Sequence, residues 1–204
     1  MGEVGDIIER KGGGRMMSQE NKEKQIRAVY TDTTIRVYQA YCPEIAEEAV
    51  RLQTFGSHFS LNRMTWIKPS FLWMMYRCGW AGKEGQERVL AIDLTREGFD
   101  SAVKQAVLSS YKEECGLSRE EWKKLVEKSD VRVQWDPEKD VHGNNLPYRS
   151  IQIGLRGQAV RDYVEKWIVR MEDITEEVKR LDALRHQGVD IVGLLPKEEI
   201  YVGP

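Results

Sequence analysis

Short apolar-polar alternations along the chain predict several β-strands. Two of them, at 25–30 and 34–40, are rich in Ile, Val and Tyr and flank the polar turn Thr31-Asp-Thr33, which predicts a hairpin. The segment 88–95 has the character of a central strand. Further strands are predicted at 131–135 and 148–155, with loops at 57–68 and 136–147.

Helical periods alternate with these strands. Pro43 marks the start of a helix that ends near Gly56, and Ser70 or Pro69 starts a short buried helix that closes at Gly79. A further helix is predicted from about Phe99 to Tyr111, and Ser118 and Glu121 form an S-x-x-E capping box at the start of another. With about five strands and about five helices in mixed order, we expect one α+β domain over residues 25–204. Its sheet should be mixed or mainly antiparallel, and a polar, disordered leader should cover residues 1–24.

Composition narrows the class of protein. Of 204 residues, 41% are hydrophobic and 31% charged, and the net charge is −2, which argues against a general DNA-coating protein. The longest apolar runs are too short for a membrane span. The three cysteines form no CxxC pair and the three histidines no HxxxH pair, so neither a disulfide framework nor a metal site is expected. Reduced thiols are typical of a cytoplasmic protein.

The segment 63–80 carries the most informative chemistry. It places three tryptophans, a tyrosine, two arginines and a lysine in an otherwise apolar run. Because burying a charge costs several kcal/mol unless it is paired, Arg63, Lys68 and Arg77 need either internal carboxylates or an anionic ligand. The tryptophans fit either a hydrophobic core or an aromatic wall against a base.

Other residues extend this candidate site. Ser70 stands at a predicted helix N-terminus, where free N–H groups favour an anion. Tyr76 joins Trp66 as the second aromatic of the wall, and Glu138, which follows a strand, is the candidate catalytic acid. Three arginines on predicted strands are candidates to bind phosphate: Arg27, Arg36 and Arg149. Arg27 and Arg36 could instead be solvated edge residues, and Arg149 could pair with Asp136 or Glu138.

Several long phrases of the sequence resemble one family of domains of unknown function, number 4291 in that series, which occurs in bacteria and fungi. They are Ile26–Tyr30, Ile35–Tyr41, Arg63–Arg77, Gln86–Ile92, Val131–Pro137 and Tyr148–Gly154. The resemblance covers about residues 25–185 and implies no activity.

A fainter similarity links Ile35–Gly56 to the opening of ADP-ribosyltransferase-type domains. Those domains bind NAD in a split antiparallel sheet, with an Arg or His on one strand, an aromatic or Ser/Thr on a second, and a late Glu. The resemblance implies Arg27 or Arg36 for the first position, Tyr76 or Ser70 for the second, and Glu138 for the acid. Glu138 departs from the usual placement of that acid, and likeness of fold does not establish function.

Three functions follow from these patterns. The first is an enzyme that binds an anionic nucleotide-type ligand, either NAD or an RNA phosphate end, in a cleft lined by Arg, Lys and Trp. The alternative is a non-enzymatic interaction module whose arginines form internal ion pairs. The third is a thiol enzyme that uses Cys78 or Cys42. No P-loop, GxGxxG, GxSxG or HExxH motif is present to choose among them.

Overall fold

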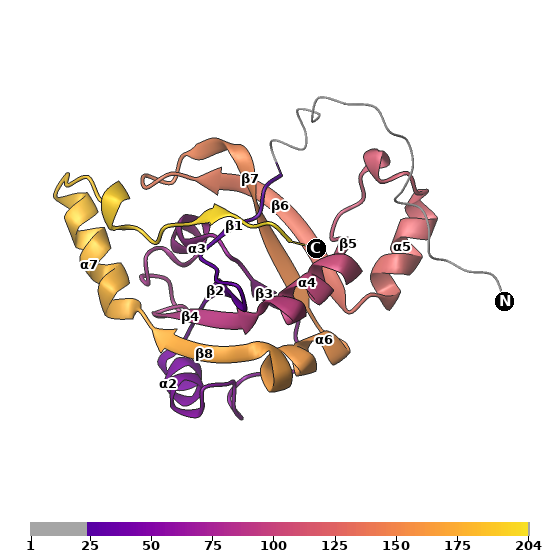
Figure 1. Ribbon diagram of the computed structural model, residues 1–204, viewed down its shortest axis with the longest axis horizontal. Helices are drawn as coiled ribbons and strands as arrows, with labels where there is room; N and C mark the ends of the chain where they lie inside the picture. The colour runs from indigo at the N-terminus through magenta and orange to yellow at the C-terminus, as the bar shows by residue number, and fades with distance from the viewer. Residues whose placement is uncertain (1–23, 204) are drawn as a thin grey trace.

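Three β-sheets form the framework of residues 24–203, the part of the chain that the computed structural model describes (Figure 1). One sheet has the order β2-β4-β8 and a second the order β3-β7-β6-β5, while β1 pairs with β9. All strand pairs are antiparallel except β5 with β6. The strands are β1 Arg27–Ala28, β2 Thr34–Tyr41, β3 Thr65–Ile67, β4 Arg88–Thr95, β5 Val107–Leu108, β6 Val131–Lys139, β7 Asn145–Leu155, β8 Ile168–Asp173 and β9 Glu199–Ile200.

Six α-helices connect and cover these sheets within the described residues. They are α2 Pro43–Leu52, α3 Phe71–Cys78, α4 Arg96–Gln105, α5 Arg119–Lys128, α6 Gly157–Asp162 and α7 Thr175–His186. A π-helical turn, Tyr163–Trp167, continues α6. The predicted α+β class with mainly antiparallel sheets is therefore confirmed. Of the expected leader, residues 1–24, only Lys24 lies inside the described range.

Local capping signals explain where two helices begin and end. The Ser118 hydroxyl accepts from the Glu121 amide at 3.2 Å, and the Glu121 carboxylate accepts from the Ser118 amide at 2.8 Å, which completes the predicted capping box. Ser70 caps α3 by accepting from the Trp73 amide at 3.2 Å. Gly79, with φ of 59°, ends α3 in the left-handed conformation that glycine adopts without steric cost.

Two hydrophobic clusters occupy the two faces of the β2-β4-β8 sheet. Ile35, Val37 and Ile92 face the larger cluster, which they share with the second sheet and α4. Tyr38 and Ala91 point to the other face, which is covered by α3 and α7. The predicted central position of strand 88–95 is confirmed, because β4 lies between β2 and β8.

Four of the sequence predictions need correction. The segment 25–30 pairs through β1 with the C-terminal β9, and only a bridge between Tyr30 and Ile35 remains of the predicted hairpin. The predicted loop 57–68 contains β3, and the predicted loop 136–147 is largely taken up by the ends of β6 and β7. The helix predicted at 99–111 is α4 followed by β5. Pairing with a strand elsewhere in the chain explains β1, β3 and β5, whereas the ends of β6 and β7 pair with each other across a short turn.

The two larger sheets meet at one point. Tyr38 of β2 bridges to Lys68, just after β3, and the Tyr38 amide donates to the Lys68 carbonyl at 2.7 Å. On the N-terminal side of Lys68 the two strands are joined by side chains, because Gln39 and Tyr41 reach Thr65 and Trp66. The sheets therefore separate at this point and leave room for a cavity.

Candidate functional site

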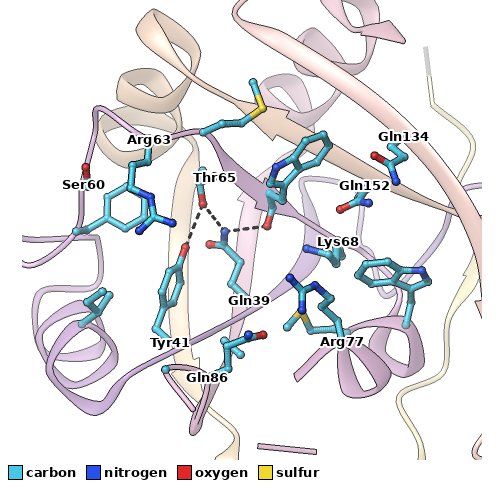
Figure 2. Close-up of a pocket in the computed structure, with 18 of the residues that line it drawn as sticks. Gln39, Tyr41, Ser60, Arg63, Thr65, Lys68, Arg77, Gln86, Gln134 and Gln152 are labelled. Atoms are coloured by element: carbon cyan, nitrogen blue, oxygen red, sulfur yellow. Dashed lines mark hydrogen bonds between the residues drawn. The ribbon is translucent and has the colours of Figure 1, made fainter. Parts of the chain in front are cut away.

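A cavity of about 640 Å³ lies where β2 and β3 separate (Figure 2). Its walls come from β2, β3, α3, β6, β7 and the segments around residues 58–64 and 85–86. The size is ordinary for a small-molecule site. The lining combines cations, aromatic rings and side-chain amides, and includes no Asp or Glu among the described residues.

Gln39 fixes the geometry at the centre of this cavity. It is 3% exposed, and its Nε2 donates to the Thr65 hydroxyl at 2.8 Å and to the Trp66 carbonyl at 3.0 Å. Its Oε1 accepts from the Tyr163 hydroxyl at 2.7 Å. The Tyr41 hydroxyl lies 3.1 Å from the Thr65 hydroxyl. This network holds β2 and β3 at a fixed separation without direct backbone pairing.

Three basic side chains line the cavity. Figure 2 shows Arg63 on one side of Gln39 and Lys68 with Arg77 on the other. None of these three side chains forms an ion pair with any residue in the described part of the chain. The cavity thus has two cationic ends, each open to a negatively charged group.

Lys68 is the most unusual of these cations, because it is only 6% exposed. Burial, together with the neighbouring Arg77 guanidinium, lowers the pKa of its amine to about 8. Asp136 opposes this shift but does not come within ion-pair distance. Nζ lies 5.1 Å from the centre of the Trp73 ring. A buried amine with a lowered pKa in a cleft marks a candidate functional group.

Two glutamines complete the end of the cavity near Lys68. The side-chain Nε2 atoms of Gln134 and Gln152 donate to opposite oxygens of Asp136 at 2.8 Å and 2.6 Å. Asp136 is not a lining residue itself, but its hydrogen bonds fix the orientation of both amides. The Gln152 carbonyl oxygen then has no partner among the described residues and can accept a hydrogen bond from a ligand.

Trp66 and Trp73 supply the aromatic walls. Trp73 is 8% exposed, whereas Trp66 is half-buried and presents its indole to the cavity. Trp66 packs directly over Gly154 of β7, where an added Cβ would lie 3.0 Å from the indole carbons and 2.8 Å from the Met64 sulfur. Gly154 is needed for this close approach.

Only part of the candidate set meets here. Arg63, Trp66 and Lys68 line the cavity, as does Arg77, whereas the other candidates do not. Arg36 pairs with both oxygens of Asp93, at 2.8 Å and 3.0 Å, in the β2-β4 ladder.

The remaining strand and helix candidates lie further away. Arg149 donates to the Trp135 carbonyl at 3.2 Å. Tyr76 is 53% exposed on the outer side of α3, where the Lys139 amine lies 3.9 Å from its ring centre. Neither side chain belongs to the lining of the cavity.

Ser70, Glu138 and Arg27 belong to a second, buried polar cluster. Glu138 is 5% exposed, and burial raises its pKa despite hydrogen bonds from Ser70, Ser150 and the Lys139 amide. The carboxylate of Glu198, from the C-terminal segment, accepts from the Phe71 amide at 2.6 Å. The place expected for an anion at the N-terminus of α3 is therefore occupied by a carboxyl group of the chain itself.

Sequence reasoning missed the polar residues that build the cavity. Gln39, Gln134 and Gln152 are uncharged, and a criterion based on charge in apolar segments does not select them. Gln39 did carry a signal, because alternation along β2 places it on the inward face with Val37. Glu198 gave none, since its role depends on contact with a helix more than a hundred residues away.

In the part of the chain that the structure describes, neither the Cys78 thiol nor the arrangement of possible metal ligands adds a second candidate site. Cys78 is fully buried, and burial raises the pKa of its thiol, which does not favour a nucleophilic thiolate. Among residues 24–203, no three His, Cys, Asp or Glu side chains gather as a metal site would require. In the same range, no helix has the length and apolar character to cross a membrane.

The fold and the cavity define an α+β protein with a cationic, aromatic-lined pocket at the junction of two sheets. Comparison with protein families then places it: the chain belongs to the family described as Domain of unknown function (DUF4291), whose model matches residues 25–201. This confirms the resemblance found in the sequence. No curated protein matches the chain.

Proposed function

We propose that the cavity binds a phosphorylated, nucleotide-type ligand, such as a free nucleotide or the phosphate end of an RNA. One observation carries the proposal: three cations line the cavity and no described carboxylate does, although the chain as a whole has a net charge of −2. Cations left without partners inside a cleft focus a positive potential there and attract anions.

Each part of the lining has a task in this proposal. Arg77 and Lys68 contact a phosphate at one end, and Arg63 contacts a second negative group at the other. Trp66 and Trp73 provide faces on which a base can stack. The fixed Gln152 amide offers a hydrogen-bond acceptor to the edge of that base.

The more specific version, NAD-dependent ADP-ribosyl transfer, has less support. The residues that the ADP-ribosyltransferase resemblance implied are Arg27 or Arg36, Tyr76 or Ser70, and Glu138, and none of them lines the cavity. NAD therefore enters the proposal as one ligand to be tested, with no catalytic acid assigned. The alternative of an interaction module fits Arg36, which pairs internally with Asp93, but not the three cations of the cavity.

Ligand binding can be tested by thermal shift and calorimetry with ATP, ADP-ribose, NAD and a short 5′-phosphorylated RNA. A ligand at a hundred times its Kd should stabilise the folded protein by about 2.7 kcal/mol. The key variant is Arg77→Gln, and Arg170→Gln, at an exposed pair on β8, is the matched control. Loss of one charged hydrogen-bond donor to phosphate is worth roughly 1.5–3 kcal/mol, or about a 10- to 100-fold weaker Kd.

The same variant separates the two hypotheses. Arg77 is exposed and forms no ion pair with the described residues. Without ligand, the free energy of unfolding of Arg77→Gln should therefore lie within about 0.5 kcal/mol of that of the parent. An interaction module with internally paired arginines would instead lose several kcal/mol. If none of the four ligands binds, or if Arg170→Gln weakens binding as much as Arg77→Gln, the proposed function is wrong.

A further inference from the structure

The position of Lys68 is unusual for a side chain that only binds phosphate. A phosphate-binding lysine works as a point charge and is best kept fully protonated. Lys68 is instead withdrawn into the wall of the cavity, 6% exposed, with no carboxylate in ion-pair contact among the described residues. The groups that face it are the Arg77 guanidinium, Asp136 at longer range, the Cys78 thiol and the Trp73 ring.

These surroundings favour a neutral, nucleophilic amine. Desolvation and an adjacent cation are the two devices by which proteins activate lysine as a nucleophile towards carbonyl compounds. With its pKa at about 8, about a quarter of the Lys68 amine is uncharged at pH 7.5. For an ordinary lysine near 10.4, the uncharged share is about a thousandth.

We propose that the Lys68 amine forms an imine with the open-chain aldehyde of a phosphorylated ribose held in the cavity, as in ribose 5-phosphate or ADP-ribose. This inference rests on the proposed function, because the cavity must first hold the phosphate. Arg63 and Arg77 are the side chains placed to do so. The recessed amine beside Arg77 is then within reach of the sugar end of the ligand.

The step is balanced without any further reagent. The nitrogen lone pair of Lys68 attacks the aldehyde carbon, forming the C–N bond, and a nitrogen-bound proton passes to the former carbonyl oxygen. The hydroxyl of the resulting carbinolamine takes a proton from solvent and leaves as water, and the second nitrogen-bound proton then returns to solvent, which gives a neutral C=N bond. Nothing is oxidised or reduced, so the imine reverts to amine and aldehyde by adding water.

Trapping with borohydride tests the inference on the unmodified protein. Borohydride delivers hydride to the C=N bond and converts the imine into a stable secondary amine, which peptide mass spectrometry locates. At pH 7.5 with ribose 5-phosphate or ADP-ribose, the label on Lys68 should exceed that on Lys166 and Lys179 at least tenfold. These two lysines are exposed and ion-paired, and lie outside the cavity.

Two comparisons make the result specific. Glyceraldehyde, an aldehyde without phosphate, should label Lys68 at least tenfold less at the same concentration. In Lys68→Arg the positive charge remains but no imine can form, so the label at this position must disappear and must not move to another cavity residue. Thermal unfolding of the variant establishes that it is folded.

Binding of ATP, which has no free aldehyde, reports on the proposed function separately. If ATP binds and neither aldehyde probe labels Lys68, the imine inference is overturned while anion binding stands. Equal labelling of Lys68, Lys166 and Lys179 also overturns it, because that pattern reflects surface glycation. Preferential, phosphate-dependent labelling of Lys68 supports it.

Discussion

Glu198 should make the protein less stable as pH rises. Its carboxylate turns inwards onto the Phe71 amide, and burial raises its pKa from 4.5 to about 8, with Glu138 acting in the same direction. Between these two pH values the folded state keeps the proton that the unfolded state has released. The unfolded state therefore binds fewer protons, so the free energy of unfolding falls with increasing pH over this window and levels off above it.

The size of this effect follows from the same pKa. Each pH unit between 4.5 and 8 weakens the folded state by up to about 1.4 kcal/mol, so the total is at most about 5 kcal/mol. This pKa already includes the opposing effect of Arg27, which favours the charged carboxylate. Glu198→Gln keeps a carbonyl oxygen that can accept from Phe71 and removes the titration. We expect the variant to match the parent at pH 5 and to be more stable by roughly 2–4 kcal/mol at pH 8.

Urea unfolding at pH 5, 6.5 and 8 measures this difference directly, because the midpoint and slope give the free energy of unfolding at each pH. Glu199→Gln is the matched control, since Glu199 is the exposed neighbour on β9. The prediction is wrong if the free energy of unfolding of Glu198→Gln falls with pH as steeply as that of the parent. It is also wrong if Glu199→Gln removes this pH dependence equally well.

Three further substitutions test the framework around the cavity by thermal or urea unfolding. Asp93→Asn breaks the bidentate pair with Arg36, whose groups are partly exposed, and should cost about 1–3 kcal/mol; a neutral result would mean that the pair adds nothing to stability. Gly98→Ala places a methyl group against the Trp167 indole and should cost about 1–3 kcal/mol, unless the ring can move aside without loss. Gln39→Leu removes the partner of the buried Tyr163 hydroxyl and one of the two partners of the Thr65 hydroxyl. It should cost about 1–3 kcal/mol, and an unchanged midpoint would contradict its role in spacing the sheets.

The elements that could be predicted from sequence are those with a local cause. The Ser118 capping box, the Ser70 cap and the Gly79 stop act within one turn of helix, and strand 88–95 is apolar enough to require a central place. β3 escaped prediction because it has three residues, and its pairing with β7 stabilises it more than its own composition does. Likewise, β1 finds its partner in β9 about 170 residues away, which no local pattern indicates.

The candidate site residues show the same difference between what local sequence indicates and what distant contacts decide. A charge within an apolar run needs an explanation wherever it lies, and this criterion selected Lys68 and Arg63, which both line the cavity. The same criterion also selected Arg36, whose explanation is a carboxylate 57 residues further along the chain. Sequence alone cannot separate these cases, since a ligand and a distant Asp satisfy a guanidinium equally well. For Arg36, the face of β2 provides the missing information. Gln39 faces the junction of the sheets, whereas Arg36 lies on the opposite face of the same strand and so points away from the cavity.

The acidic residues near the cavity explain how an anion site arises in a chain with 33 acidic and 31 basic residues. Asp136 is held by two glutamine amides, and Glu48 accepts from Ser57 and His58 at the rim. Neither carboxylate belongs to the lining, and each holds side chains or amides of residues that do: Gln134, Gln152 and His58. Their negative charge is thus used within the protein, while the cations of Lys68 and Arg77 remain directed at the cavity. The electrostatic potential of the cavity therefore depends on which charges are already paired within the fold. The net charge of the chain does not determine it.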